Sequence, residues 1–236
     1  YKMVNKMDKH ELLNQDIDSK KRIEQIKIEP NNTILFIGDS ITDVNRDREN
    51  DEDLGHGYPT LVGAHLLHKY PGYDLKIYNR GIGGQKVIDL KKRWENDCLE
   101  LNPDVVSILI GINDVWQIMD GESKEVEEDL AKFEEDYRYL LKSLAQRTDA
   151  RVILMEPFVL PYPKDRQNWR SSLDPRLQIV RRLANDYHAA FIPLDGLMNA
   201  KGIENDFQTY TGDDGVHPTL TGHALIADAW LSYLTL

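Results

Sequence analysis

A serine, an aspartate and a histidine in this chain have the types and the positions needed to activate a hydroxyl nucleophile. Ser40 follows an apolar run at residues 33–37, and Asp214 and His217 stand three residues apart near the other end of the sequence. A serine hydroxyl attacks a carbonyl only when a base takes its proton, and a carboxylate beside the other imidazole nitrogen fixes the tautomer. The pattern predicts acyl transfer through Ser40, with His217 as base and Asp214 as the acid that orients it.

Attack on a carbonyl produces a negative oxygen, so such a site also needs preorganised hydrogen-bond donors. The sequence offers three: the backbone N–H of Ser40, the backbone N–H of Gly81 and the side-chain amide of Asn113. The missing side chain of Gly81 favours a close approach to the substrate. Losing one donor of this kind costs about 10²–10³ in rate. These three groups are therefore the predicted oxyanion hole.

The residues around these groups indicate how they are positioned. Short apolar runs alternate with longer amphipathic stretches, which is typical of parallel βαβ units. The predicted strands are residues 33–37, 75–78, 105–110, 152–155 and 190–193. Right-handed crossovers place helices on both faces of such a sheet, and functional groups gather at the carboxyl ends of the strands. We expect an α/β fold, a flavodoxin-like three-layer α/β/α sandwich with a five-stranded parallel sheet.

The connecting segments give more local predictions. Apolar residues at helical spacing predict a helix across 126–144, and Asp174-Pro175 is a good helix start because an N-cap side chain precedes a proline. Residues 156–173 contain three prolines and no clear period, so they read as a long surface loop. Arg166 and Arg170 within it are expected to be solvated charges.

Composition limits the function classes. A length of 236 residues suits a single domain, predicted as 26–236 after a polar extension at 1–25. The formal net charge of −11 disfavours nucleic acid as a partner, and no apolar stretch has the roughly 20 residues needed to span a membrane. No signal peptide is visible, which favours a cytoplasmic location. Cys98 is the only cysteine, so no intrachain disulfide can form.

Four segments together resemble the SGNH (GDSL-type) esterase and acylhydrolase superfamily. They are Gly38-Asp39-Ser40-Ile41-Thr42, Asn79-Arg80-Gly81, Gly111-Ile112-Asn113-Asp114 and Asp214-Gly215-Val216-His217-Pro218. The stretches 80–94 and 110–116 are most similar to bacterial acetylxylan esterases and related carbohydrate acetylesterases. This resemblance implies the SGNH hydrolase fold, removal of O-acetyl groups from xylan-derived sugars, and homo-oligomers. One departure is Asp213, where the most similar esterases carry an aromatic residue before the acid.

Other residues allow more than one interpretation. Asp39 and Trp116 are candidate substrate-binding residues, although Asp39 could only hold the turn and Trp116 could only pack the loop. The remaining histidines, including His223, are expected to be surface or packing residues. No histidine has acids at a repeated spacing that suggests a metal ligand, so we predict no metal and no cofactor.

Two alternative functions follow from the same residues. A lysophospholipase or thioesterase could use the same scaffold, but the loops beside Ser40 are polar where a long acyl chain needs an apolar groove. A non-catalytic flavodoxin-like binding module is the second alternative. It is disfavoured because a phospho-acceptor module needs acidic groups where Ser40 and Asn113 stand.

Overall fold

The computed structural model of this chain describes residues 25–121 and 127–235. Five parallel strands form a sheet in the order β2-β1-β3-β4-β5. Their bounds are Thr33–Gly38 (β1), Lys76–Gly81 (β2), Val105–Leu109 (β3), Arg151–Met155 (β4) and Ala190–Ile192 (β5). All five lie where the sequence predicts a strand. The predicted extension lies outside the described residues except for Gln25, and so does Val126 of the predicted helix.

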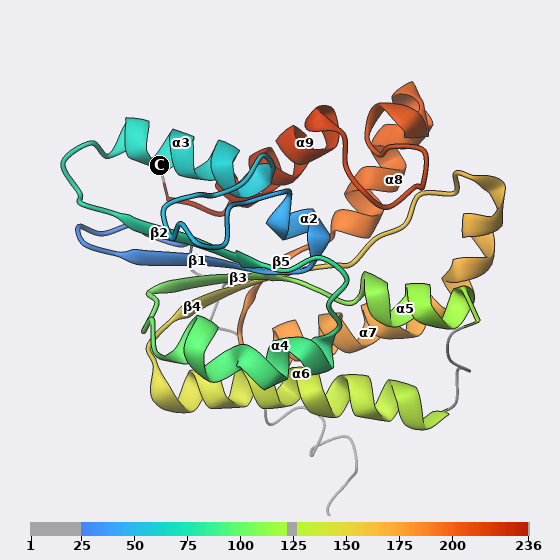
Figure 1. Cartoon of the computed structure of the whole chain (residues 1–236), viewed down its shortest axis with the longest axis horizontal. Coiled ribbons are helices and arrows are strands. Elements are labelled where there is room, and N and C mark those ends of the chain that lie inside the picture. The colour runs from blue at the N-terminus through green and yellow to red at the C-terminus, as the bar shows by residue number, and fades with distance from the viewer. Residues whose placement is uncertain (1–24, 122–126, 236) are drawn as a thin grey trace, which may run out of the picture.

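Helices cover both faces of the sheet (Figure 1). One layer contains α3 (Tyr58–Lys69), α8 (Leu194–Asn205) and α9 (Leu220–Leu231); the other contains α4 (Val87–Trp94), α6 (Glu127–Arg147) and α7 (Arg170–Asp186). Side chains of a strand point alternately to opposite faces. Accordingly Ile34 and Phe36 enter the core under α3 and α9, whereas Leu35 and Ile37 enter the other core. The predicted three-layer α/β/α sandwich is confirmed.

The chain order makes the carboxyl ends of β1 and β3 the place where a site is expected. From β1 the chain first adds β2 on one side and then returns to add β3 on the other, which makes β1/β3 the point where connections diverge. Gly38 at the end of β1 is level with Gly81 of β2 and Leu109 of β3. The short helix α2 (Ser40–Asp43) follows β1, and α5 (Ile112–Met119) follows β3. Two predicted site residues therefore begin helices at the same edge of the sheet.

The segment 156–173 differs from its prediction as an irregular surface loop. Phe158, Val159 and Leu160 are buried in the core, and a 3₁₀ helix, η2, spans Lys164–Trp169. Helix α7 begins at Arg170, four residues before the expected Asp174-Pro175 start. Pro175 therefore lies inside α7, where it cannot donate the usual backbone hydrogen bond of a helix.

The remaining short elements are a π-helix, η1 (Glu95–Leu99), and a second 3₁₀ helix, η3 (Phe207–Thr209). Within residues 25–121 and 127–235, no helix combines the length and apolar character required to cross a membrane.

Candidate active site

Ser40 is the first residue of α2 and lies one residue beyond β1. Glycine at position 38 is required by the close approach of β3, because a Cβ there would lie 2.1 Å from the Leu109 carbonyl oxygen. Asp39 caps α2: its Oδ1 accepts the N–H of Ile41 at 3.0 Å. Asp39 is only 1% exposed, and this burial raises its pKa to about 7. The position does not suit the predicted substrate contact; Asp39 holds the turn that presents Ser40.

The predicted nucleophile, base and acid lie in one hydrogen-bonded row. Ser40 Oγ is 2.8 Å from His217 Nε2, and His217 Nδ1 is 2.5 Å from Asp214 Oδ2. The hydroxyl and the imidazole are 177 positions apart in the chain. The fold brings them together because the segment after η3 returns to the carboxyl edge of the sheet. This arrangement can remove the Ser40 proton during attack on a carbonyl.

The three-residue spacing of Asp214 and His217 has a local explanation. Asp214 Oδ1 accepts the backbone N–H groups of Val216 at 2.8 Å and of His217 at 2.9 Å. The second carboxylate oxygen is then left to face the imidazole. Gly215 between them has φ of +75°, and a Cβ there would lie 1.9 Å from the Tyr162 carbonyl oxygen. The glycine is therefore needed for the turn that holds both groups.

The two ionisable partners shift each other's protonation. Burial opposes the charge on Asp214, but hydrogen bonds from the His217 ring and from two backbone N–H groups lower its pKa to about 2. The hydrogen bond to Asp214 raises the pKa of His217, with burial acting in the opposite direction. Asp214 is therefore ionised at neutral pH and stabilises the imidazolium that forms when His217 accepts a proton.

The structure does not support Gly81 as an oxyanion donor. The Gly81 N–H donates to Asn79 Oδ1 at 2.8 Å, and Gly81 is buried. The Asn79 amide nitrogen in turn donates to the carbonyls of Thr42 at 2.6 Å and Leu54 at 2.8 Å. The reason for a glycine is steric, because a Cβ on Gly81 would lie 2.3 Å from the Asp43 backbone nitrogen. Gly81 lets β2 pack against α2.

Replacement of Gly81 by alanine is expected to lower the free energy of unfolding by about 1–3 kcal/mol, because the clash is with backbone that has little room to move. Urea denaturation of the wild-type and G81A proteins measures this difference. An unchanged midpoint and slope would show that the packing assigned to Gly81 is wrong.

Gly83 and Gly84 follow Gly81 along the chain, and Gly83 lies beside the nucleophile. A Cβ on Gly83 would be 3.7 Å from Ser40 Cβ, and the Gly83 N–H donates to Asp43 Oδ2 at 3.1 Å. Gly84 is exposed with φ of +79°. In the described part of the chain, no acceptor is bonded to the backbone N–H of Gly84 or of Ser40.

Asn113 occupies the first turn of α5 and its amide is oriented by the backbone. The amide nitrogen donates to the Gln85 carbonyl oxygen at 3.0 Å. A primary amide carries two N–H donors, so one remains after this bond is made. The bond ties Asn113 to the glycine segment, which brings the predicted side-chain donor to the same loop cluster as Gly84.

Arg166, which is expected from the sequence to be a solvated charge, instead contacts the loop that carries Asp214. Arg166 Nε donates to the Asp214 carbonyl oxygen at 2.8 Å, and its guanidinium lies 4.2 Å from the Trp169 ring centre and 5.2 Å from that of Trp116. Trp116 packs edge-on against Trp169 at 5.0 Å, and its ring centre is 5.9 Å from that of His217. Trp116 is thus a wall beside the histidine. No local sequence signal identifies Arg166.

A pocket of about 320 Å³ opens beside the hydroxyl. It is lined by Ser40, Asp43, Val44, Asn45, Gly83, His217, Pro218 and His223. Across residues 25–121 and 127–235, no group of three or more histidine, cysteine, aspartate or glutamate side chains could hold a metal ion.

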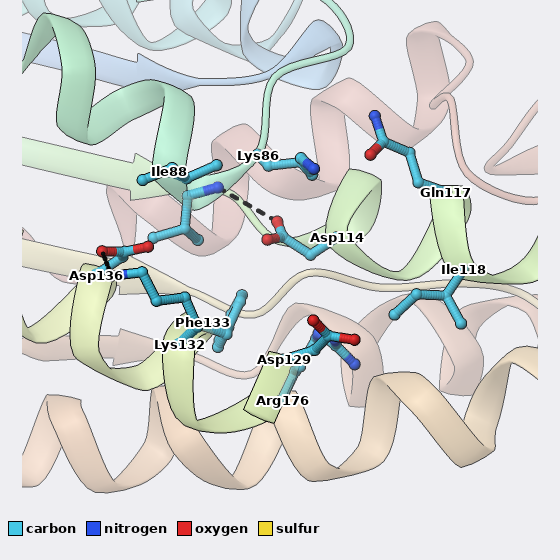
Figure 2. A pocket seen from close by; sticks show the side chains of 11 residues that line it. Lys86, Ile88, Asp114, Gln117, Ile118, Asp129, Lys132, Phe133, Asp136 and Arg176 are labelled. Atoms are coloured by element: carbon cyan, nitrogen blue, oxygen red, sulfur yellow. Dashed lines mark hydrogen bonds and ion pairs between the residues drawn. The ribbon is translucent and has the colours of Figure 1, made fainter. Parts of the chain in front are cut away.

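A second, smaller pocket of about 130 Å³ lies between α4, α5, α6 and α7 (Figure 2). Asp114 Oδ2 accepts the N–H of Val87 at 3.3 Å, which links α5 to the start of α4. Asp136 accepts from Lys132 at 2.9 Å and from Lys91 at 2.7 Å. Burial raises the pKa of Asp114 to about 7. The bond between Val87 and Asp114 holds the first turn of α5, which contains Asn113, against the start of α4.

Comparison with known proteins identifies close relatives. An acetylxylan esterase of Geobacillus stearothermophilus is 35% identical over 216 residues, which cover 87% of this chain and 95% of the relative. The crystal structure of that esterase superposes with a TM-score of 0.79 at 32% identity, over 89% of this chain and 97% of that one. A GDSL-like lipase from Parabacteroides merdae superposes with a TM-score of 0.81 at 34% identity, over 89% and 98% of the two chains.

Solved variants of the Geobacillus esterase with a serine, an aspartate or a histidine replaced by alanine are described as catalytic mutants. The model of the GDSL-like lipase/acylhydrolase family matches residues 36–225 of the present sequence, which include all the groups discussed above. The chain therefore belongs to the GDSL-like lipase/acylhydrolase family and is a carboxylic ester hydrolase.

Proposed function

We propose that this protein is a serine esterase that removes O-acetyl groups from carbohydrates of the xylo-oligosaccharide type through an acetyl-enzyme intermediate. The observation that carries the proposal is the row of hydrogen bonds from Ser40 Oγ through His217 to Asp214, at 2.8 and 2.5 Å. The carbohydrate substrate is supported by the identity to acetylxylan esterase along most of the chain.

The geometry supports a two-step mechanism. Ser40 Oγ attacks the acetyl carbonyl carbon while His217 Nε2 takes the hydroxyl proton. The imidazolium then returns that proton to the sugar oxygen as its bond to the acetyl carbon breaks. In the second step His217 removes a proton from water, and the resulting hydroxide attacks the acetyl carbonyl carbon. The bond from Ser40 Oγ to that carbon breaks, His217 returns the proton to Ser40 Oγ, and acetate leaves. No cofactor is required for either step.

The negative oxygen of each tetrahedral intermediate needs donors, and we assign three. They are the backbone N–H of Ser40, the backbone N–H of Gly84 and the free amide N–H of Asn113. Gly84 replaces Gly81 in this role, because the Gly81 N–H is bonded to Asn79. Asp214 stays ionised and holds the imidazole with its proton on Nδ1, which leaves Nε2 to accept from Ser40.

The polar side chains in the pocket favour a short acyl group on a polyhydroxy alcohol over a long acyl chain. Asp43, Asn45 and two histidines line the pocket at Ser40, and the Trp116 ring centre lies 5.9 Å from that of His217. A lysophospholipase or thioesterase would need an extended apolar groove there. Release of acetate from acetylated xylo-oligosaccharides, together with a p-nitrophenyl ester series from acetate to octanoate, separates these functions. Equal rates on acetate and octanoate would exclude the acetylesterase.

The activity should decline on the acid side at a pH above the ordinary imidazole value of 6.5. Catalysis needs neutral His217, and its pKa is raised by the bond to Asp214, so activity is lost as the pH falls through that raised value. The pH profile of kcat/KM measures this for the free enzyme. A profile that stays flat down to pH 5 would contradict the assignment of His217 as base.

Replacement of Asn113 by alanine is expected to lower kcat by about 10²–10³ while KM changes little, because the lost donor acts mainly on the transition state. Steady-state kinetics with p-nitrophenyl acetate measures both constants. Gln117 is half-buried on the same helix, and Q117A serves as the control. A loss confined to KM would show that Asn113 contacts the substrate and does not stabilise the oxyanion.

The homo-oligomer and the cytoplasmic location remain predictions, as does the boundary between residues 1–25 and the catalytic domain. Analytical ultracentrifugation of the full chain measures the oligomeric state.

A further inference from the structure

His223 is a buried histidine that the mechanism above does not use. It lies in the first turn of α9, is 4% exposed, and lines the pocket that contains Ser40 and His217. Its ring stacks on that of Tyr58, with 6.5 Å between centroids and 21° between planes. Which of its two ring nitrogens, Nδ1 or Nε2, can face the pocket depends on the hydrogen bond that the other one makes.

The tautomer of His223 is fixed by the start of α3. The backbone N–H of Tyr58, the first residue of that helix, donates to His223 Nδ1 at 3.2 Å. Nδ1 must therefore carry a lone pair, and a neutral imidazole then has its proton on Nε2. Burial, together with the nearby charge of His217, lowers the pKa of His223 to about 4. The ring stays neutral around pH 7, and Nε2 is a donor there.

The Nε2–H donor of His223 can bind a ligand. The Nδ1 edge of the ring packs against the start of α3: Nδ1 accepts the Tyr58 N–H, and a Cβ on Gly57 would lie only 2.9 Å from Cε1. Among the described residues, none accepts from Nε2. Nε2 also does not belong to the buried side-chain atoms without a partner, so it is reached from the pocket.

The acceptors of an acetyl ester indicate which part of the substrate the Nε2–H donor can bind. The acetyl group has one acceptor, its carbonyl oxygen, and the oxyanion donors take it. The pocket of about 320 Å³ is also much larger than an acetyl group, whose three heavy atoms need roughly 90 Å³ at the volume of three waters. Only the alcohol part of the ester can supply a further acceptor and fill the space.

We propose that His223 Nε2–H binds a hydroxyl or ring oxygen of the sugar that carries the acetyl group, and so makes this enzyme select polyhydroxy alcohols. The inference rests on the carbohydrate acetylesterase function proposed above. A site that hydrogen-bonds a substrate oxygen rejects an analogue without it, because its buried donor is then unpaired.

Two variants separate the donor from the structural bond to Tyr58. In H223N the amide oxygen can replace Nδ1 as acceptor from the Tyr58 N–H, but the Nε2 donor is lost. In H223Q the amide nitrogen reaches the Nε2 position and keeps the donor, but the acceptor is lost. His65 is exposed on α3, the helix that Tyr58 begins, and gives the control variant H65N.

The readout is the sugar preference, defined as the kcat/KM for a mono-O-acetyl methyl xyloside divided by that for cyclohexyl acetate. H223N is expected to lower this preference roughly 10- to 100-fold, the loss of one good hydrogen bond. H223Q is expected to melt at a lower temperature than wild type and to retain the preference, and H65N to change neither.

Equal losses on both esters in H223N would leave the preference unchanged and would overturn the proposal, since that is the result of a purely structural role. A wild-type enzyme without any sugar preference would overturn this proposal and the proposed function together. A wild-type preference that survives in H223N overturns only the role of His223.

Discussion

Replacement of Ser40 by alanine is expected to lower kcat/KM for acetylated xylo-oligosaccharides by about 10⁴-fold or more, because no other group can form the acyl-enzyme. Ser40 Oγ is the atom that faces His217 Nε2 at 2.8 Å, and the alanine side chain leaves the turn capped by Asp39 in place. Acetate release by matched preparations of wild type and S40A measures the loss.

The control for this experiment is Ser232, which is exposed at the end of α9 and whose hydroxyl donates to the Ala229 carbonyl oxygen. S232A should turn over acetylated substrates at the wild-type rate. Activity in S40A within tenfold of wild type, with its melting temperature unchanged, would rule out Ser40 as the nucleophile.

Replacement of Asp214 by asparagine should have the second largest effect, a loss of about 10⁴-fold in kcat. The asparagine oxygen can still accept the backbone N–H groups of Val216 and His217, so the turn should persist. Its NH₂ group would then face His217 Nδ1 and donate to it. The imidazole proton would move to Nε2, which could no longer accept from Ser40.

Stopped assays with p-nitrophenyl acetate measure kcat for D214N, and its thermal melting shows whether the turn is intact. D228N, at an exposed position of α9, is the matched charge control. A loss smaller than tenfold in folded D214N would show that the carboxylate does not set the imidazole tautomer.

The strands were predictable because their apolar runs reflect burial on both faces of a parallel sheet. The clearest discrepancy is β2, which continues through Asn79 and Arg80 to Gly81. These residues pair in register with Phe36, Ile37 and Gly38 of β1, but polar side chains hide the strand pattern. Their roles arise only in the folded chain, where Asn79 reaches back to the α2 turn.

The helix start at Arg170 shows the limit of local signals. Asp174-Pro175 has the residue types of an N-terminus, yet Arg170 pairs with Asp195 of α8 through two bonds of 2.8 Å and begins the helix earlier. A tertiary ion pair of this kind leaves no trace in nearby sequence. It also corrects the prediction that Arg170 is a solvated charge.

The limit of local sequence signals is also seen in the site. Ser40, Asp214 and His217 were recognisable because nucleophile, base and acid are restricted to a few residue types. Gly81 was misassigned because a glycine is explained equally by substrate approach or by packing, and only the bond to Asn79 and the clash with Asp43 decide between them. The role of Arg166 is not predictable from nearby sequence, because Trp116 and the Asp214 carbonyl come from segments far from it in the chain.

Covalent labelling of the folded enzyme by a fluorophosphonate, followed by peptide mass spectrometry, tests the central claim most directly. One adduct on the peptide that contains Ser40 is expected, with labelling slowed in H217A and absent in S40A. An adduct on a different serine, or none on active wild-type enzyme, would contradict the assignment of Ser40 as the activated nucleophile.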